Sequence, residues 1–202
     1  MYIKLYKRLI DILLSVFGFI LISPLFLLVA LLIHFEDRGP IFYNANRLGR
    51  NGKVFKMYKF RSMKSNAPDI RNEDGSTFNS ECDMRVTKIG KIIRKASIDE
   101  LPQLLNVIKG DMSLIGPRPD LPEALNIYSD VERKKLTVRP GITGYNQAYY
   151  RNSNSQSEKF KNDIFYVDNI SFNMDFKILF ITIKNVLARK NINNAKKPVV
   201  KN

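Results

Sequence analysis

The chain has 202 residues and is strongly basic, with 33 lysines and arginines against 19 acidic residues and a formal net charge of +14. This length suits one domain with a core and one extra element, and it argues against two globular domains. The single cysteine excludes an internal disulfide, and together with the single histidine it excludes a zinc site built from these two residue types. The charge predicts anionic partners, which include phospholipid headgroups, nucleotides and nucleic acid.

A long apolar run covers residues 12–33. As a helix it reaches roughly 33 Å at about 1.5 Å per residue, which is enough to cross a bilayer. Ser23 and Pro24 interrupt the run near its middle, where the proline frees the carbonyl group of Ile20 and the serine can bind freed backbone groups. Basic residues on both sides favour the cytoplasm, and a straight span cannot place both flanks there. The residues leave two topologies open: a re-entrant pair of half-helices and a kinked single span.

Residues 53–63 predict a strand that is rich in aromatic side chains. Lys59 and Arg61 then share a face, because side chains two positions apart point to the same side of a strand. Two cations on one face suit a diphosphate, although a solvated face is the commoner explanation of such a pattern. Further along, residues 88–95 predict a basic helix from which Arg94 can face the same site.

Two adjacent carboxylates, Asp99 and Glu100, stand where a short apolar helix is expected to begin, and that helix should end before Gly110. Pro102 should fall in its first turn, because a proline has no N–H to donate. A helix N-terminus would keep the carboxylates ionised and would favour a nearby phosphate. Three interpretations stay open: a capping box of Ser97 with Glu100, a Mg²⁺ ligand pair, and a nucleophilic aspartate.

Two rigid turns each present one arginine. In residues 116–119, prolines on both sides of Arg118 stiffen the loop that carries its guanidinium, which suits bidentate binding of a phosphate. Residues 139–144 form a second such turn with Arg139 at its mouth. The alternative for both is an ordinary turn with an exposed arginine.

The C-terminal part predicts an amphipathic helix over residues 175–189, with apolar side chains on one face and basic side chains on the other. A basic polar face suits a helix that lies on anionic lipid, and packing on the core is the alternative. The polar, basic residues 191–202 predict a disordered tail.

Four stretches, residues 59–63, 85–90, 97–119 and 138–144, together with the apolar N-terminal run, resemble the bacterial sugar transferase family. These are monotopic phosphoglycosyl transferases that prime glycan assembly on polyprenyl phosphate. The resemblance covers nearly the whole chain, and the central block with its spacing to the arginine turn is highly specific. The family's Ser-Pro break matches Ser23 and Pro24, which favours the re-entrant hairpin.

The resemblance implies a chemistry that composition does not reveal. In this family the aspartate of an Asp-Glu pair attacks the β-phosphate of a UDP-sugar, releases UMP and carries the phosphosugar until polyprenyl phosphate takes it. Carried over, Asp99 is the nucleophile, Asp99 and Glu100 hold Mg²⁺, and Glu100 assists metal placement or proton handling. The candidate phosphate contacts are Lys59, Arg61, Arg94, Arg118 and Arg139.

One segment departs from the family pattern. After Gly144 a Gln-Val-x-Gly-Arg-like stretch is expected, and residues 145–152 differ from it. If this loop touches the sugar or the nucleotide, the sugar donor is unusual. Residues 66–83 are polar and irregular, and we expect them to form a mobile loop over the site.

We therefore expect an α+β fold that is mostly helical, with a re-entrant membrane helix-break-helix, a small strand element and amphipathic interfacial helices. Residues 1–36 would form the membrane segment, 37–190 a catalytic domain on the cytoplasmic face of a bacterial inner membrane, and 191–202 the tail. The expected partners are a UDP-sugar, polyprenyl phosphate and anionic lipid, with no nucleic acid and with a homodimer left open. The alternative is a non-catalytic, membrane-anchored basic module that binds anionic lipid or nucleic acid.

Overall fold

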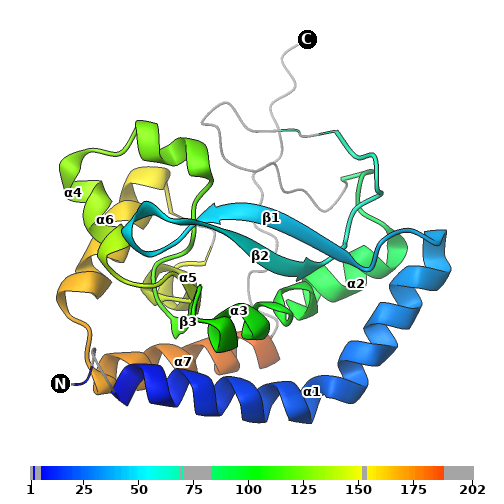
Figure 1. The fold of residues 1–202 in the computed structure, drawn as a ribbon, viewed down its shortest axis with the longest axis horizontal. Helices are drawn as coiled ribbons and strands as arrows, with labels where there is room; N and C mark the ends of the chain where they lie inside the picture. Colours follow the sequence, from blue (N-terminus) through cyan, green and yellow to red (C-terminus); the bar gives the residue numbers. More distant parts are fainter. Residues whose placement is uncertain (1, 3–5, 69, 71–82, 152–153, 189–202) are drawn as a thin grey trace.

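The computed structural model describes residues 2, 6–68, 70, 83–151 and 154–188, arranged as Figure 1 shows. Helices dominate this part of the chain and its strands are short, which confirms the predicted α+β class. The elements, with 3₁₀ helices labelled η, are α1 (Lys7–Asp37), β1 (Phe42–Leu48), η2 (Arg50–Gly52), β2 (Val54–Phe60), α2 (Lys88–Lys95), η3 (Ile98–Glu100), α3 (Gln103–Lys109), β3 (Ser113–Ile115), η4 (Pro122–Asn126), α4 (Asp130–Arg133), η5 (Lys134–Thr137), β4 (Gly141–Thr143), α5 (Tyr145–Tyr149), α6 (Gln156–Asp168) and α7 (Phe172–Leu187). The expected tail, 191–202, and most of the expected loop, 66–83, lie outside the described residues.

The apolar run forms α1, a helix of 31 residues that continues through Pro24. Among the described residues it is the one helix long and apolar enough to cross a membrane. The Ser23 hydroxyl donates to the Ile20 carbonyl at 2.8 Å, which satisfies the group that the proline leaves without an N–H partner. Figure 1 shows α1 changing direction part-way along its length. The predicted break is therefore a bend inside one helix.

The C-terminal half of α1 packs on the globular part of the molecule. Val29 and Ile33 are buried against Phe60 of β2 and Ile93 of α2, and this cluster joins three elements. Burying such side chains stabilises the fold by about 1.5–3 kcal/mol each. The second half of the apolar run is thus part of the protein core on one side.

Two small sheets hold the site segments. Strands β1 and β2 form an antiparallel hairpin in which Phe42 pairs with Phe60, and β3 pairs in parallel with β4. Beyond β3, a Cβ atom on Gly116 would lie 2.5 Å from the carbonyl oxygen of Arg139, so only glycine allows this approach. The two arginine turns predicted from the sequence therefore lie side by side.

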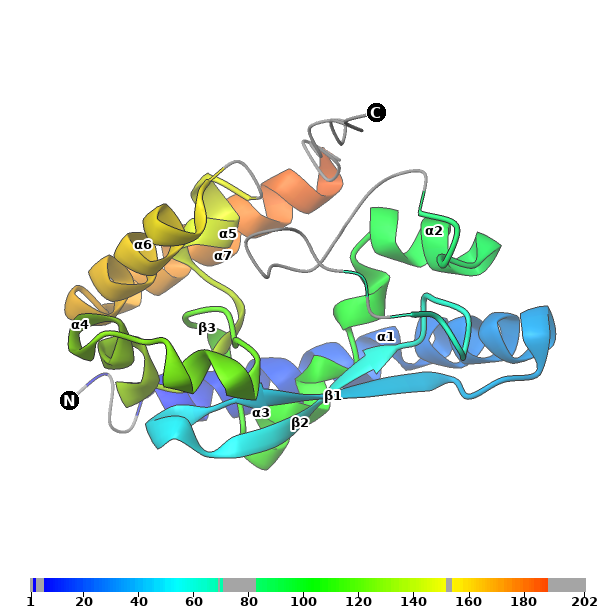
Figure 2. The same ribbon diagram turned by 90° about the horizontal axis from the view of Figure 1, so that it is seen from above.

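The C-terminal helices form their own layer. Figure 2 shows α5, α6 and α7 grouped on one side of the molecule, away from α2. Their core contains Ala148, Tyr166 and Ile178, packed on Ile115 at the end of β3. A further cluster of Met57, Val107 and Met112 joins β2 to α3 and to the start of β3. The parallel β3–β4 pair thus lies between the two halves of the fold.

The structure corrects the predicted helix that begins at the carboxylate pair. Residues Ile98–Glu100 form a single 3₁₀ turn, and α3 starts only after Pro102, because the proline lacks the N–H that a continuous helix would use. The predicted stop is confirmed, since Gly110 has a φ of 102° and its N–H binds the carbonyl groups of Asn106 and Val107. The carboxylates therefore lie on a short turn between α2 and α3.

Candidate active site

The capping box predicted for Ser97 and Glu100 is not formed. Ser97 has a left-handed backbone with a φ of 56°, and its side chain makes no capping hydrogen bond. The Glu100 carboxylate instead accepts from Lys59 Nζ at 2.7 Å and from Arg118 Nη2 at 3.1 Å, both on Oε1. Charged donors bind a carboxylate more strongly than a backbone N–H does. The Glu100 carboxylate therefore binds the two cations from other segments and does not cap the turn.

These two cations control the charge of Glu100. Its side chain is 22% exposed, and burial alone would raise its pKa. Lys59 and Arg118 outweigh burial and lower the pKa of Glu100 to about 2. Glu100 is therefore a fixed negative charge that joins strand β2 to the loop after β3.

Asp99 differs from its neighbour in both partners and charge. Among the described residues, no hydrogen bond or ion pair engages its carboxylate. Burial raises the pKa of Asp99 and Glu100 adds to this, while Lys59, Arg94 and Arg118 act in the opposite direction. The direction is opposite to the one expected from a helix N-terminus, because a single 3₁₀ turn has little dipole to offset burial.

The structure thus brings three of the five predicted phosphate contacts to the carboxylate pair. Lys59 comes from the end of β2, Arg94 from the last turn of α2 and Arg118 from the proline-flanked loop. These segments are far apart in the sequence and meet only in the fold. The result is a free carboxylate within the field of three cations.

Arg61 lies elsewhere. Strand β2 ends at Phe60, so the alternation that would place Arg61 beside Lys59 does not continue. The Arg61 guanidinium pairs with both carboxylate oxygens of Asp37 and donates to the carbonyl of Pro40, and the residue is 5% exposed. Through these contacts Arg61 links the C-terminal end of α1 to the end of strand β2.

Arg139 also lies away from Asp99. Its Nε donates to the carbonyl of Gly110 at 2.8 Å, at the C-terminal end of α3. Arg8 donates to the carbonyls of Val107 and Ile108 at the same end, at 2.7 and 3.1 Å. The two arginines thus cap the carbonyl groups of α3, and the predicted phosphate contact at Arg139 is not part of this site.

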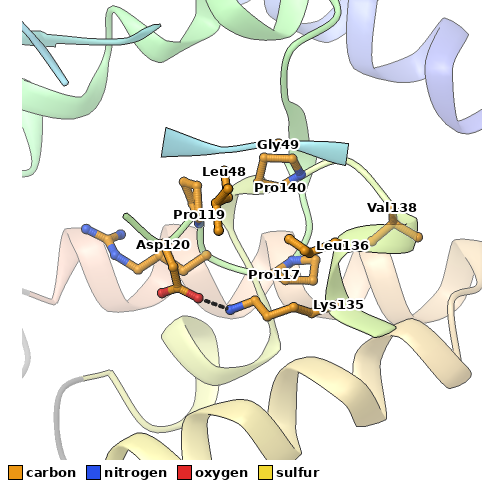
Figure 3. Close-up of a pocket in the computed structure, with 10 residues that line it drawn as sticks. Leu48, Gly49, Pro117, Pro119, Asp120, Lys135, Leu136, Val138 and Pro140 are labelled. Atoms are coloured by element: carbon orange, nitrogen blue, oxygen red, sulfur yellow. Dashed lines mark hydrogen bonds and ion pairs between the residues drawn. The ribbon is translucent and has the colours of Figure 1, made fainter. Parts of the chain in front are cut away.

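A buried ionic cluster beside the Arg118 loop was missed in the sequence. Lys135, in η5, is 5% exposed and binds the carboxylates of Asp120 and Asp163 at 2.7 Å each. Figure 3 shows Lys135 and Asp120 facing each other at a small cavity beside the prolines of that loop. Because Lys135 follows two other basic residues, the sequence indicates a solvated surface, and no local signal marks it as buried.

The segment that departs from the family pattern forms α5 and the residues after it. The rings of Tyr145 and Tyr149 lie 4.7 Å apart, and Tyr145 also contacts Phe165 of α6 at 5.0 Å between centroids. Tyr149 and Tyr150 are half exposed, whereas Asn152 lies outside the described residues. The segment thus presents tyrosine rings to solvent.

Asp99 and Glu100 could supply some, but not all, of the ligands of a Mg²⁺ ion. Within the described ranges, no three histidine, cysteine or acidic side chains form a group that could hold a metal ion. Mg²⁺ usually takes one or two carboxylates and completes its shell with water and substrate phosphates, so the pair of Asp99 and Glu100 fits such an ion. Asp99 is the more available ligand, because Glu100 already binds two cations.

Comparison with known proteins identifies the family. Residues 2–189 match the family described as bacterial sugar transferase. The chain belongs to the bacterial sugar transferase family. The prediction of family is confirmed, and with it the prediction that the chain is an enzyme, a phosphoglycosyl transferase. Family membership favours catalysis over the non-catalytic basic module that the charge left open.

Several members of the bacterial sugar transferase family are similar over most of this chain. The uncharacterized sugar transferase EpsL of Bacillus subtilis (strain 168) is 43% identical, and the match covers 92% of this chain and 89% of EpsL. The exopolysaccharide production protein ExoY of Sinorhizobium fredii is 42% identical, with 89% of this chain and 84% of ExoY covered. The UDP-N-acetylgalactosamine-undecaprenyl-phosphate N-acetylgalactosaminephosphotransferase of Aeromonas hydrophila is also 42% identical, and the match covers 90% of this chain and 44% of that protein.

Proposed function

We propose that this enzyme transfers a phosphosugar from a UDP-sugar to polyprenyl phosphate, giving UMP and a polyprenyl diphosphate sugar, the priming step of glycan assembly. The observation that carries the proposal is the unpaired Asp99 carboxylate within the field of Lys59, Arg94 and Arg118. The names of the relatives support it, since the Aeromonas hydrophila protein is a UDP-N-acetylgalactosamine-undecaprenyl-phosphate phosphotransferase and a Salmonella typhimurium relative is an undecaprenyl-phosphate galactose phosphotransferase.

Asp99 is the nucleophile of the proposed reaction. Its carboxylate has free lone pairs, whereas an oxygen of Glu100 is occupied by Lys59 and Arg118. The raised pKa of Asp99 makes its ionised carboxylate a stronger base and a stronger nucleophile. An Asp99 oxygen forms a bond to the β-phosphorus, the bond from that phosphorus to the UMP oxygen breaks, and UMP leaves with the electron pair. A polyprenyl phosphate oxygen then attacks the same phosphorus and releases the carboxylate.

The surrounding cations reduce the repulsion between a carboxylate and a diphosphate. Arg118 and Arg94 present guanidinium groups, which suit bidentate contacts with phosphate oxygens. Mg²⁺ bound by Asp99 and Glu100 would supply further neutralisation of the diphosphate. Glu100 holds Lys59 and Arg118 in place between these charges.

We also propose that α1 enters and leaves the cytoplasmic side of the membrane without crossing it. Near its start, Lys7 pairs with Asp175 of α7 at 2.6 Å. Near its end, Glu36 accepts from the N–H of Lys88 at 2.6 Å at the start of α2. Because both ends of α1 bind the same globular part, a straight span would have to place that part on both sides of the bilayer.

The exposed apolar surface supports this placement. Most apolar side chains in the middle of α1 are exposed, among them Phe17, Ile20 and Leu21, at 67–69%. Helix α7 exposes Phe176 and Phe180 at 61% and 64%, and both helices lie along the lower edge of the molecule in Figure 1. Other α7 side chains pack in the core, which is the alternative that the sequence left open for this helix. We propose that this edge faces the inner membrane and its anionic lipid.

The test is UMP release by the purified protein with Mg²⁺, polyprenyl phosphate and a panel of UDP-sugars. Without acceptor, a UDP-sugar labelled in the β-phosphate should label the protein covalently, and Asp99→Asn should abolish that labelling. Asp130→Asn, at an exposed aspartate on α4, is the matched control and should label normally. Labelling that survives in Asp99→Asn would overturn the assignment of the nucleophile.

A further inference from the structure

The buried cluster around Lys135 joins three elements next to the Arg118 loop. Lys135 Nζ lies 2.7 Å from an oxygen of Asp120 and 2.7 Å from an oxygen of Asp163. The Tyr128 hydroxyl donates to the same oxygen of Asp120. One ammonium group and two carboxyl groups thus meet in a buried place, where burial raises the pKa of Asp163 and Lys135 opposes that shift.

A buried ionic cluster of this kind contributes little to the stability of a fold. Removing charges from water costs several kcal/mol per ion, and apolar side chains of similar volume often stabilise a core as well or better. The backbone around it is already fixed, because the N–H of Leu48 binds the Asp120 carbonyl and the N–H of Gly141 binds the Pro117 carbonyl, both at 2.9 Å. Neither stability nor the position of the backbone therefore explains why charged side chains occupy this place.

Asp120 competes with Glu100 for the same cation. It lies two residues after Arg118, and the two charges attract each other through space. The Arg118 side chain is 52% exposed, so it has room to adopt either direction. In the structure Arg118 donates to Glu100, whereas the Asp120 carboxylate accepts from Lys135 and Tyr128.

We propose that Lys135 is a positioning residue: by neutralising Asp120, it keeps the Arg118 guanidinium on Glu100 and beside Asp99. Without the ammonium group, Asp120 becomes an unneutralised carboxylate two residues from Arg118, and Arg118 turns back toward it. The cation is then lost from the site where the diphosphate would bind. The catalytic part of this role rests on the proposed function, whereas the choice of partner by Arg118 does not.

Two double variants test the idea. Each removes the ammonium group and one carboxylate: Lys135→Gln with Asp120→Asn leaves Asp163, and Lys135→Gln with Asp163→Asn leaves Asp120. We expect the Asp120→Asn pair to keep kcat/KM for UMP release within about threefold of the wild-type value. The Asp163→Asn pair should lose about 10- to 100-fold, as expected for a misplaced group in an active site. If the glutamine pairs do not fold, the same two pairs with Lys135→Met make the comparison.

A second measurement needs no turnover. A thermal-unfolding double-mutant cycle between Arg118→Gln and Glu100→Gln should show coupling in the wild type and in the Asp120→Asn pair, and none in the Asp163→Asn pair. Equal kcat/KM and equal coupling in the two pairs would overturn the positioning role. A wild-type protein that releases no UMP would overturn the proposed substrates instead, and the unfolding cycle would still decide the role of Lys135.

Discussion

Glu100 is expected to stabilise the fold through its charge, and the size of this effect can be worked out from its pKa. Lys59 and Arg118 lower the pKa of Glu100 from 4.5 to about 2 against the opposing effect of burial. At about 1.4 kcal/mol per pKa unit, the ionised side chain contributes about 3 kcal/mol at pH 7. Because the pKa is lowered in the folded state, this stability is present above pH 4.5 and is lost as the pH falls toward 2.

The variant Glu100→Gln tests this reasoning, because glutamine resembles the protonated side chain in shape. We expect the difference in unfolding free energy between the wild type and Glu100→Gln to fall from about 3 kcal/mol at pH 7 to about 2 kcal/mol at pH 3.5. Denaturant unfolding in detergent micelles, with a chelator present, measures both proteins at each pH. Glu123→Gln, at an exposed glutamate, is the control and should show no such trend. A difference that stays constant from pH 7 to pH 3.5 would mean that packing and not charge makes Glu100 important.

Three further outcomes follow from the geometry. Arg139→Gln should lower the unfolding free energy by about 1 kcal/mol, because it removes a donor from the Gly110 carbonyl, and it should leave KM for the UDP-sugar unchanged. Gly116→Ala should destabilise the fold by about 3 kcal/mol or more in thermal unfolding, because its Cβ atom would lie 2.5 Å from a backbone oxygen. Single cysteines placed before Lys7 and after Asp37, in a Cys82→Ser background, should both react only with a reagent on the cytoplasmic side; labelling of the N-terminal cysteine from the outside would contradict the re-entrant placement.

Helix ends and short helices could be predicted where a few neighbouring residues determine them. The stop at Gly110 follows from the freedom of glycine at positive φ, and the basic helix over residues 88–95 has the predicted bounds. The sequence predicted an interruption at Pro24, but α1 continues through this residue as one helix, and the Ser23 hydroxyl binds the Ile20 carbonyl that the proline leaves without an N–H partner. The capping box failed because Glu100 has stronger partners elsewhere, and those partners come from distant parts of the chain.

The predicted phosphate contacts also show that a local pattern does not determine which distant residues a side chain will meet. Lys59, Arg94 and Arg118 were predicted as phosphate contacts and do meet at Asp99. Arg61 matched the same pattern and is instead paired with Asp37, because strand β2 ends one residue before it. A linear pattern shows which side chains carry charge, and it does not show which carboxylate each one will reach.

Sequence alone determined the apolar helix, the carboxylate pair and the rigid arginine loop, because each of these depends on neighbours within a few positions. It also determined the family, because several motifs along the chain resemble it. Only the tertiary structure decided which carboxylate stays free. Asp99 and Glu100 are adjacent and chemically alike, yet Lys59 and Arg118 both bind Glu100. The folding of β2 and of the loop after β3 onto the same turn brings those cations there. Charges separated along the chain interact only when packing makes them neighbours, because their attraction falls with distance and is screened by water.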